Sequence, residues 1–137
     1  MISVKVNEAV AASADAVWAL LRDFGGIQRF SSGIESCTVE GAGVGAVRTI
    51  TMPGGVQIQE RLEAFDDSAR SLSYAIVAGP IPVTNYLSSI HVSEDGEGCT
   101  IAWGSDFESS LPADQARGMI EGIYTGSIAG IKKTLGV

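Results

Sequence analysis

The stretch "MIEGIYTGSIAGIKK" (residues 119–133) decides the fold of this chain, because it reads as the middle of a long amphipathic helix. Pro112 suits the first turn of that helix, which extends to about residue 135. At about 100° per residue, one broad face collects its large residues. That face holds Ile120, Ile123, Tyr124, Ser127, Ile128, Ile131 and Leu135. Such a helix needs a large apolar partner, which the rest of the chain has to supply.

Glycine recurs at every fourth position of this helix, at residues 118, 122, 126 and 130. Each glycine costs about 1 kcal/mol relative to alanine in a helix interior, so a structural reason is expected. Successive glycines drift around the helix by about 40°, which places Gly118 on the far side and Gly130 at the border of the apolar face. We expect close packing at Gly126 and free space at Gly118.

The residues before the helix predict one strand, two short helical segments and six further strands. Residues 2–10 alternate as a half-buried strand, Ser13 is a good N-cap for a helix with "ADAVWALLRDF", and "IQRF" after Gly25 and Gly26 favours one more short turn or helix. The six further strands are expected near 34–41, 44–52, 56–66, 70–78, 84–94 and 98–108. The fold class is therefore α+β, a single domain over residues 1–137 in which a seven-stranded curved antiparallel sheet wraps around the C-terminal helix.

Strand alternation places two charged residues on the inner face of this sheet. In "VQIQERLEA" (residues 56–64), Glu60 shares a face with Ile58 and Leu62. If "PGG" is the whole connection, Arg48 lies directly opposite Glu60. An ion pair in a sheet is most often partly solvated and worth little, whereas a buried pair is rarely a net gain over apolar packing. Retention of a buried pair would indicate a functional role.

The last hairpin adds aromatic and hydroxyl side chains to the same inner face. With a turn at Asp95-Gly96, Tyr86 and Ser88 point inward opposite Ser105 and Trp103, and Tyr74 comes from the preceding strand. A slip of the register by one pair of residues would leave these faces unchanged. His91, the single histidine, points outward. The predicted interior is apolar with a few polar groups, which is typical of a small-molecule cavity. The candidate ligand-binding residues are Arg48, Glu60, Tyr74, Tyr86, Ser88 and Trp103 of the sheet, and Met119, Ile123 and Ser127 of the helix.

Composition excludes several classes of function. The 137-residue chain carries a formal net charge of −7, which argues against nucleic acid or an anionic membrane as partner. No apolar stretch is long enough to span a membrane, and no signal pattern opens the chain, so we expect a cytoplasmic protein. Cys37 and Cys99 lack metal-ligand spacing, and no phosphate-binding loop or Ser-His-Asp set is present. We expect no metal and no cofactor, and a monomer or homodimer.

Three motifs carry a resemblance to a known family: "VWALLRDF" (17–24), "ERLEAFDD" (60–67) and "PVTNY" (82–86). Over nearly its full length the chain resembles the polyketide cyclase/dehydrase-type branch of the START-like superfamily (SRPBCC). The resemblance implies the helix-grip fold of the birch pollen allergen, with a hydrophobic ligand cavity between sheet and helix. It also identifies Gly126 with a glycine common in the closing helix of that family.

Plant abscisic acid receptors share "ERL", a following "DD" and the "NY.S" pattern with this chain. The resemblance implies ligand contacts for Glu60, Tyr86 and Ser88. Their ligand-carboxylate lysine aligns with Ser31, and their latch aligns with residues 81–83, "IPV". These departures argue against abscisic acid as the ligand.

Three functions remain open at this point. The favoured one is binding of a small hydrophobic or aromatic molecule, polyketide-like or lipid-like, in an internal cavity. The second is a polyketide cyclase or aromatase-like enzyme in which Glu60 acts as acid or base with the cavity tyrosines. The third is a ligand-dependent regulatory protein that binds a partner.

Overall fold

The computed structural model describes residues 1–31 and 33–137 and has the α+β architecture predicted from the sequence. Its elements, in chain order, are β1 (Ile2–Val10), α1 (Ala14–Leu21), η1 (Ile27–Arg29), β2 (Ser36–Glu40), β3 (Val47–Thr51), β4 (Gln57–Asp66), β5 (Ser71–Ala78), β6 (Val83–Asp95), β7 (Gly98–Ser109) and α2 (Ala113–Leu135). The second helical segment is a single 3₁₀ turn of three residues, Ile27–Arg29. Gly25 and Gly26 directly before it separate it from α1.

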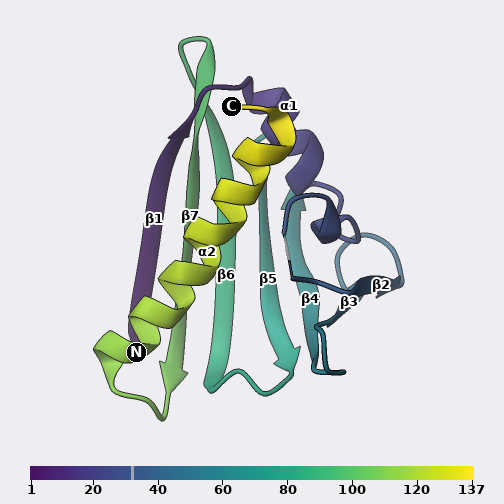
Figure 1. The fold of residues 1–137 in the computed structure, drawn as a ribbon, viewed down its shortest axis with the longest axis vertical. Coiled ribbons are helices and arrows are strands. Elements are labelled where there is room, and N and C mark those ends of the chain that lie inside the picture. Colours follow the sequence, from purple (N-terminus) through teal and green to yellow (C-terminus); the bar gives the residue numbers. More distant parts are fainter. Residues whose placement is uncertain (32) are drawn as a thin grey trace.

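The seven strands form one antiparallel sheet in the order β1-β7-β6-β5-β4-β3-β2. Figure 1 shows α2 running obliquely across one face of this sheet, from the β7 side at its start to α1 at its end. The opposite face of the sheet has no helix over it in this view. The helix-grip arrangement expected from the sequence is confirmed.

Strand register agrees with the prediction in one hairpin and differs in the other. Arg48 pairs with Glu60 and Ile50 with Ile58, as alternation and the three-residue "PGG" connection predict. In the β6–β7 hairpin, Ser88 pairs with Ser105, two residues away from the predicted partner Trp103. The turn consists of Gly96 and Glu97 between the paired residues 95 and 98, with Gly96 at φ +63°. A shift of two residues keeps every side chain on its predicted face.

A bulge interrupts β6 beside Tyr86, which stays on the inner face with Ser88 and Ile90. The pairing with β7 is interrupted between Thr84 and Leu87, and Asn85 has a φ of +52°. A bulge of this kind bends the strand and redirects one side chain. Tyr86 is buried, while Asn85 donates a hydrogen bond to Glu108 Oε2 at 3.0 Å on the outside.

Two predictions for the closing helix are wrong. Ile123, expected on the face that grips the sheet, is 46% exposed, because its neighbour Tyr124 takes the buried position. Gly126, expected to pack closely, has no heavy atom from outside its own stretch of helix within 4 Å of where a Cβ would lie. The close approach is instead at Gly130, where a Cβ would collide with the backbone of Phe30. Free space at Gly118 is confirmed.

Candidate functional site

An ion pair is buried on the inner face of the sheet, between β3 and β4. Arg48 Nη2 lies 2.6 Å and Nε 2.8 Å from Glu60 Oε1, and the two residues are 7% and 8% exposed. Arg48 Nη1 also donates to the backbone oxygen of Phe24 at 3.0 Å. The guanidinium carbon lies 4.1 Å from the ring centroid of Phe24 and 5.2 Å from that of Tyr74. The pair is therefore buried, hydrogen-bonded and enclosed by two aromatic rings, which is the arrangement in which a buried charge is tolerated.

A cluster of hydroxyl groups lies under α2. The hydroxyls of Tyr86, on β6, and Tyr124, on α2, form a hydrogen bond. Tyr124 also donates to Ser88 Oγ at 3.2 Å, and Ser88 donates in turn to the backbone oxygen of Gly104 at 3.0 Å. Trp103 Nε1 donates to the Tyr74 hydroxyl at 3.1 Å. This tyrosine cluster, defined as Tyr74, Tyr86 and Tyr124, ties the helix to the middle of the sheet.

Aromatic packing fills the space between α2 and the sheet. The rings of Trp103 and Tyr124 stack at 5.2 Å between centroids with an interplanar angle of 17°. Tyr86 packs at 6.3 Å from Tyr74 and at 5.8 Å from Phe107. Contacts of this size are favourable beyond the area that they bury, and they occupy the volume where the sequence predicted a cavity.

Burial raises the pKa of all three tyrosines above the ordinary value of 10.0. The main cause in each case is desolvation, which penalises the phenolate. The Glu60 carboxylate raises the pKa of Tyr74 further, because it repels a nearby phenolate. These tyrosines therefore stay protonated at neutral pH and act as neutral hydrogen-bonding groups.

One polar atom of the interior has no partner among the described residues. Ser105 Oγ is buried and makes no hydrogen bond of good geometry there, although it lies close enough to the Tyr124 hydroxyl to lower the pKa of that group against the larger rise that burial causes. An unpaired buried hydroxyl costs about 1–3 kcal/mol. It marks a position on the inner face where a ligand oxygen would be stabilised.

The structure brings together most of the residues predicted for the site. Six of them are buried on the inner face of the sheet: Arg48, Glu60, Tyr74, Tyr86, Ser88 and Trp103. Ser127 of α2 is also buried, Met119 is partly buried against the core, and Ile123 points outward. The sequence did not single out Tyr124 or Phe24 as site residues. The sequence places both residues on apolar helix faces. It does not predict the contact of Tyr124 with Ser88 or of Phe24 with Arg48, because these partners lie far away in the chain.

A pocket of about 420 Å³ opens beside the ion pair. It lies between the end of α1 and the β2–β3 connection, and the inner face of the sheet contributes Ala46 and Leu62. Phe24 lines this pocket and also stacks on Arg48. Phe24 therefore separates the pocket from the buried pair.

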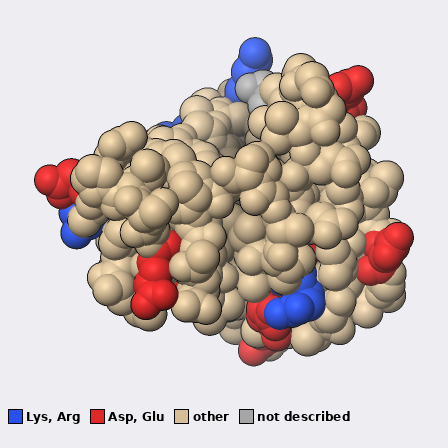
Figure 2. Space-filling view, turned by 90° about the horizontal axis from the view of Figure 1, so that it is seen from below, with Lys and Arg blue, Asp and Glu red and all other residues tan. Residues whose placement is uncertain are grey.

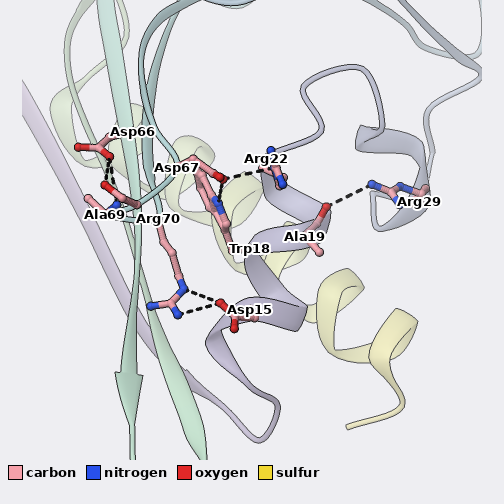
Figure 3. Close-up of polar contacts among 10 residues, drawn as sticks. Asp15, Trp18, Ala19, Arg22, Arg29, Asp66, Asp67, Ala69 and Arg70 are labelled. Atoms are coloured by element: carbon pink, nitrogen blue, oxygen red, sulfur yellow. Dashed lines mark hydrogen bonds and ion pairs between the residues drawn. The ribbon is translucent and has the colours of Figure 1, made fainter.

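Side chains of the β4–β5 turn hold α1 in the position that shapes this pocket (Figure 3). Trp18 Nε1 donates to Asp67 Oδ1 at 2.7 Å, and Arg22 Nε lies 3.4 Å from the same oxygen. Arg70 donates twice to Asp15 Oδ1, at 2.8 and 3.0 Å. These side chains come from two segments about fifty residues apart. The position of α1, and with it the start of the segment that carries Phe24, is therefore fixed by tertiary contacts.

A larger hollow of about 780 Å³ lies against β1, β7 and β6, and most of the side chains that line it point outward. Its floor is made by Ala102 and Gly104, and Lys5 and His91 stand on either side. A third pocket, of about 280 Å³, lies beside α1 and the β4–β5 turn. None of these three pockets is lined by the tyrosine cluster. The expected cavity of several hundred Å³ under α2 is therefore not one of these three pockets.

Residues 1–31 and 33–137 hold neither a cluster of metal-ligating side chains nor a membrane-spanning helix. They contain no group of three or more His, Cys, Asp or Glu side chains placed to hold a metal ion. No helix in that part of the chain is long and apolar enough to cross a membrane.

Residues 1–136 match the family described as polyketide cyclase / dehydrase and lipid transport. Among known proteins, the chain is 35% identical over 94 residues to abscisic acid receptor PYL2 and 34% identical over 101 residues to abscisic acid receptor PYL6, both of Arabidopsis thaliana. These matches cover 65% and 68% of this chain, but only 50% and 46% of the receptors. The chain thus spans about half of the length of these relatives.

Solved structures share the fold over nearly the whole chain. An uncharacterised protein from Bacillus thuringiensis superposes with a TM-score of 0.90 at 28% identity, covering 98% of this chain and 99% of that one. The protein XoxI from Bacillus cereus gives 0.89 at 30% identity, with 97% and 94% covered. Norcoclaurine synthase from Thalictrum flavum, solved with dopamine and hydroxybenzaldehyde, gives 0.74 at 23% identity, with 97% and 85% covered. At 23% identity, this similarity shows a shared fold and nothing about the reaction.

Proposed function

The chain belongs to the polyketide cyclase / dehydrase and lipid transport family, and from this premise we propose that it binds a small apolar or aromatic molecule on the inner face of the sheet, under α2. The observation that carries the proposal is the group of polar side chains gathered in an otherwise apolar interior. It consists of Arg48, Glu60, Tyr74, Tyr86, Ser88, Ser105, Tyr124 and Ser127, all buried.

Stability alone does not account for this polar group. A buried ion pair is often no better than apolar side chains of the same volume, and the unpartnered Ser105 Oγ is a net cost. Ligand sites in proteins combine an apolar lining with a few convergent polar groups. Two relatives named as abscisic acid receptors support binding of a small organic molecule by this fold.

Binding requires the interior to open, because Tyr124 and Trp103 stack in the space that a ligand would take. The stack joins α2 to β7, so displacement of the helix or rotation of Tyr124 frees it. Seen from below, the end with the β3–β4, β5–β6 and β7–α2 connections is largely without charged side chains, which lie toward its edges (Figure 2). An uncharged end of this kind suits the passage of an apolar molecule.

Binding is favoured over acid–base catalysis because the Glu60 carboxylate is already held in an ion pair with Arg48. Its Oε1 already accepts from both Nε and Nη2 of Arg48, and the tyrosines, whose pKa values are raised, hold their protons. A regulatory role through a protein partner stays a prediction, as do the cytoplasmic location and the oligomeric state.

Aminoanthracene, an apolar fluorescent probe, tests the proposal with the two tryptophans of the chain as reporters. A ligand under α2 contacts Trp103, which lies in the interior, whereas Trp18 lies beside Asp67 at the end of the sheet. We expect saturable quenching of tryptophan emission by the probe. The signal should persist in Trp18→Phe and disappear in Trp103→Phe.

The opposite reporter pattern would place the probe beside α1 and overturn the proposed site. Absence of saturable binding to the wild-type protein, by fluorescence and by calorimetry, would overturn the proposed function. Native mass spectrometry of protein purified from its own host then identifies a co-purifying molecule.

A further inference from the structure

The charges buried in the interior cancel one another. In the described part of the chain, Arg48 and Glu60 are the buried charged residues, and they are paired. The cations on α2 are engaged elsewhere or exposed: Lys132 pairs with Glu8 of β1 at 2.8 Å, and Arg117 pairs with Asp114 on the surface. The inner face therefore has no net charge to offer a ligand.

The guanidinium group of Arg48 already uses three of its N–H groups in hydrogen bonds within the protein. Nε and Nη2 donate to Glu60, Nη1 donates to the backbone oxygen of Phe24, and the rings of Phe24 and Tyr74 lie close to the group. Three of its five N–H groups are thus used, so a ligand carboxylate would have to compete with Glu60 for this cation or displace it. The displaced Glu60 would then be a buried carboxylate without a partner, which is strongly unfavourable.

The polar groups that remain are neutral hydroxyls. Tyr74, Tyr86, Tyr124, Ser88 and Ser105 can each donate or accept a hydrogen bond. Ser105 Oγ makes no hydrogen bond of good geometry within the described structure. Such groups satisfy a ketone, hydroxyl or ester oxygen, but they do not compensate the desolvation of a carboxylate.

We infer that this interior selects neutral oxygen-bearing apolar molecules and rejects carboxylates, and that Glu60 sets this selectivity by neutralising Arg48. The inference rests on the proposed function, since it concerns the same site. It assigns Glu60 a role in specificity that requires no proton transfer. It also makes a gain of function predictable, because removing the Glu60 charge leaves Arg48 free to hold an anion.

Naphthoate and its methyl ester test the inference, because they share one ring system and differ in charge. Each is titrated against the aminoanthracene complex at neutral pH. For the wild-type protein, the ester should displace the probe at a concentration at least about tenfold lower than naphthoate does. In Glu60→Gln, naphthoate should gain at least about tenfold, while the ester changes little.

Glu63→Gln is the matched control. Glu63 lies on the same strand and pairs with Arg61 at 2.7 Å, but this pair is at the surface, with a third of the Glu63 side chain exposed. The substitution changes the net charge equally, so it should leave the ratio between ester and naphthoate as in the wild type. A gain for naphthoate in both variants would mean a general charge effect and overturn the role of Glu60.

The outcomes separate the inference from the proposed function. If wild-type protein binds naphthoate as tightly as the ester, the inference is wrong while the function stands. If the probe does not bind at all, the proposed function fails, and the inference with it. Should Glu60→Gln be too unstable to assay, the wild-type comparison alone still decides whether carboxylates are rejected.

Discussion

Replacement of Gly130 by alanine tests the one position where the glycines of α2 are required by packing. The backbone of Phe30, just after η1, passes against the helix there, and a Cβ on residue 130 would lie 2.8 Å from the Phe30 carbonyl carbon and closer still to its oxygen. Real Cβ atoms essentially never approach a heavy atom within 3.0 Å. Because the obstacle is backbone, a side-chain rotation cannot relieve it.

The expected cost follows from what has to move. Phe30 is buried in the core, and Thr134 Oγ1 donates to the backbone oxygen of Arg29 at 2.8 Å, so the segment is held from both sides. Overpacking of this kind costs about 3 kcal/mol at the upper end of its range, and the better helix propensity of alanine returns about 1 kcal/mol. We expect a net loss of about 2 kcal/mol, or roughly 7 °C in Tm for a chain of this length.

Gly118→Ala and Gly122→Ala are the controls, since nothing lies within 4 Å of either Cβ position. Each should stabilise the protein by up to about 1 kcal/mol, because alanine lowers the entropy of the unfolded chain. Thermal melts and urea titrations of the three variants give the comparison. A Gly130→Ala protein as stable as Gly122→Ala would refute the close approach of Phe30 as the reason for glycine at that position.

Three further predictions concern the interior. Arg48→Met should lower the free energy of unfolding, measured in a urea titration, by about 3 kcal/mol, because Glu60 is left buried without a partner. Adding Glu60→Leu should recover most of that loss. An equal loss in the double variant would show that the pair itself stabilises the fold. The three tyrosines should not ionise near pH 10 in the native protein, because burial raises each pKa from 10.0. The unfolded chain releases these protons first, so stability is full below pH 10 and falls as the pH rises above it, and tyrosinate absorbance should increase only together with loss of circular dichroism. Ser105→Ala should raise the stability of the ligand-free protein by about 1 kcal/mol, because it removes an unpartnered hydroxyl, and an unchanged or lower melting temperature would contradict that assignment.

The faces of the strands could be predicted from the sequence wherever no bulge interrupts a strand, because side chains then alternate with a period of two. In β4 a shift in pairing between Leu62 and Ala64 leaves Ala64 exposed and packs Phe65 against the core. Arg48 and Glu60 share the inner face and one register position, as the alternation and the length of the "PGG" connection require. Tyr86 and Ser88 are also inside, even though the hairpin register differs from the prediction by two residues. A shift by an even number moves the partners and leaves the faces unchanged.

Contacts between distant segments could not be predicted in this way, because they depend on how the helix crosses the sheet. The helical period alone allowed both Ile123 and Tyr124 on the buried face, and the crossing direction of α2 selected Tyr124, which reaches Ser88. The same crossing brings Gly130, rather than Gly126, against the backbone of Phe30. The sequence by itself thus determined the element order, the inner face and its polar residues, since these follow from local periodicity. Only the tertiary structure decided which helix residues meet them and how the space between is filled, because packing depends on the relative placement of elements a hundred residues apart.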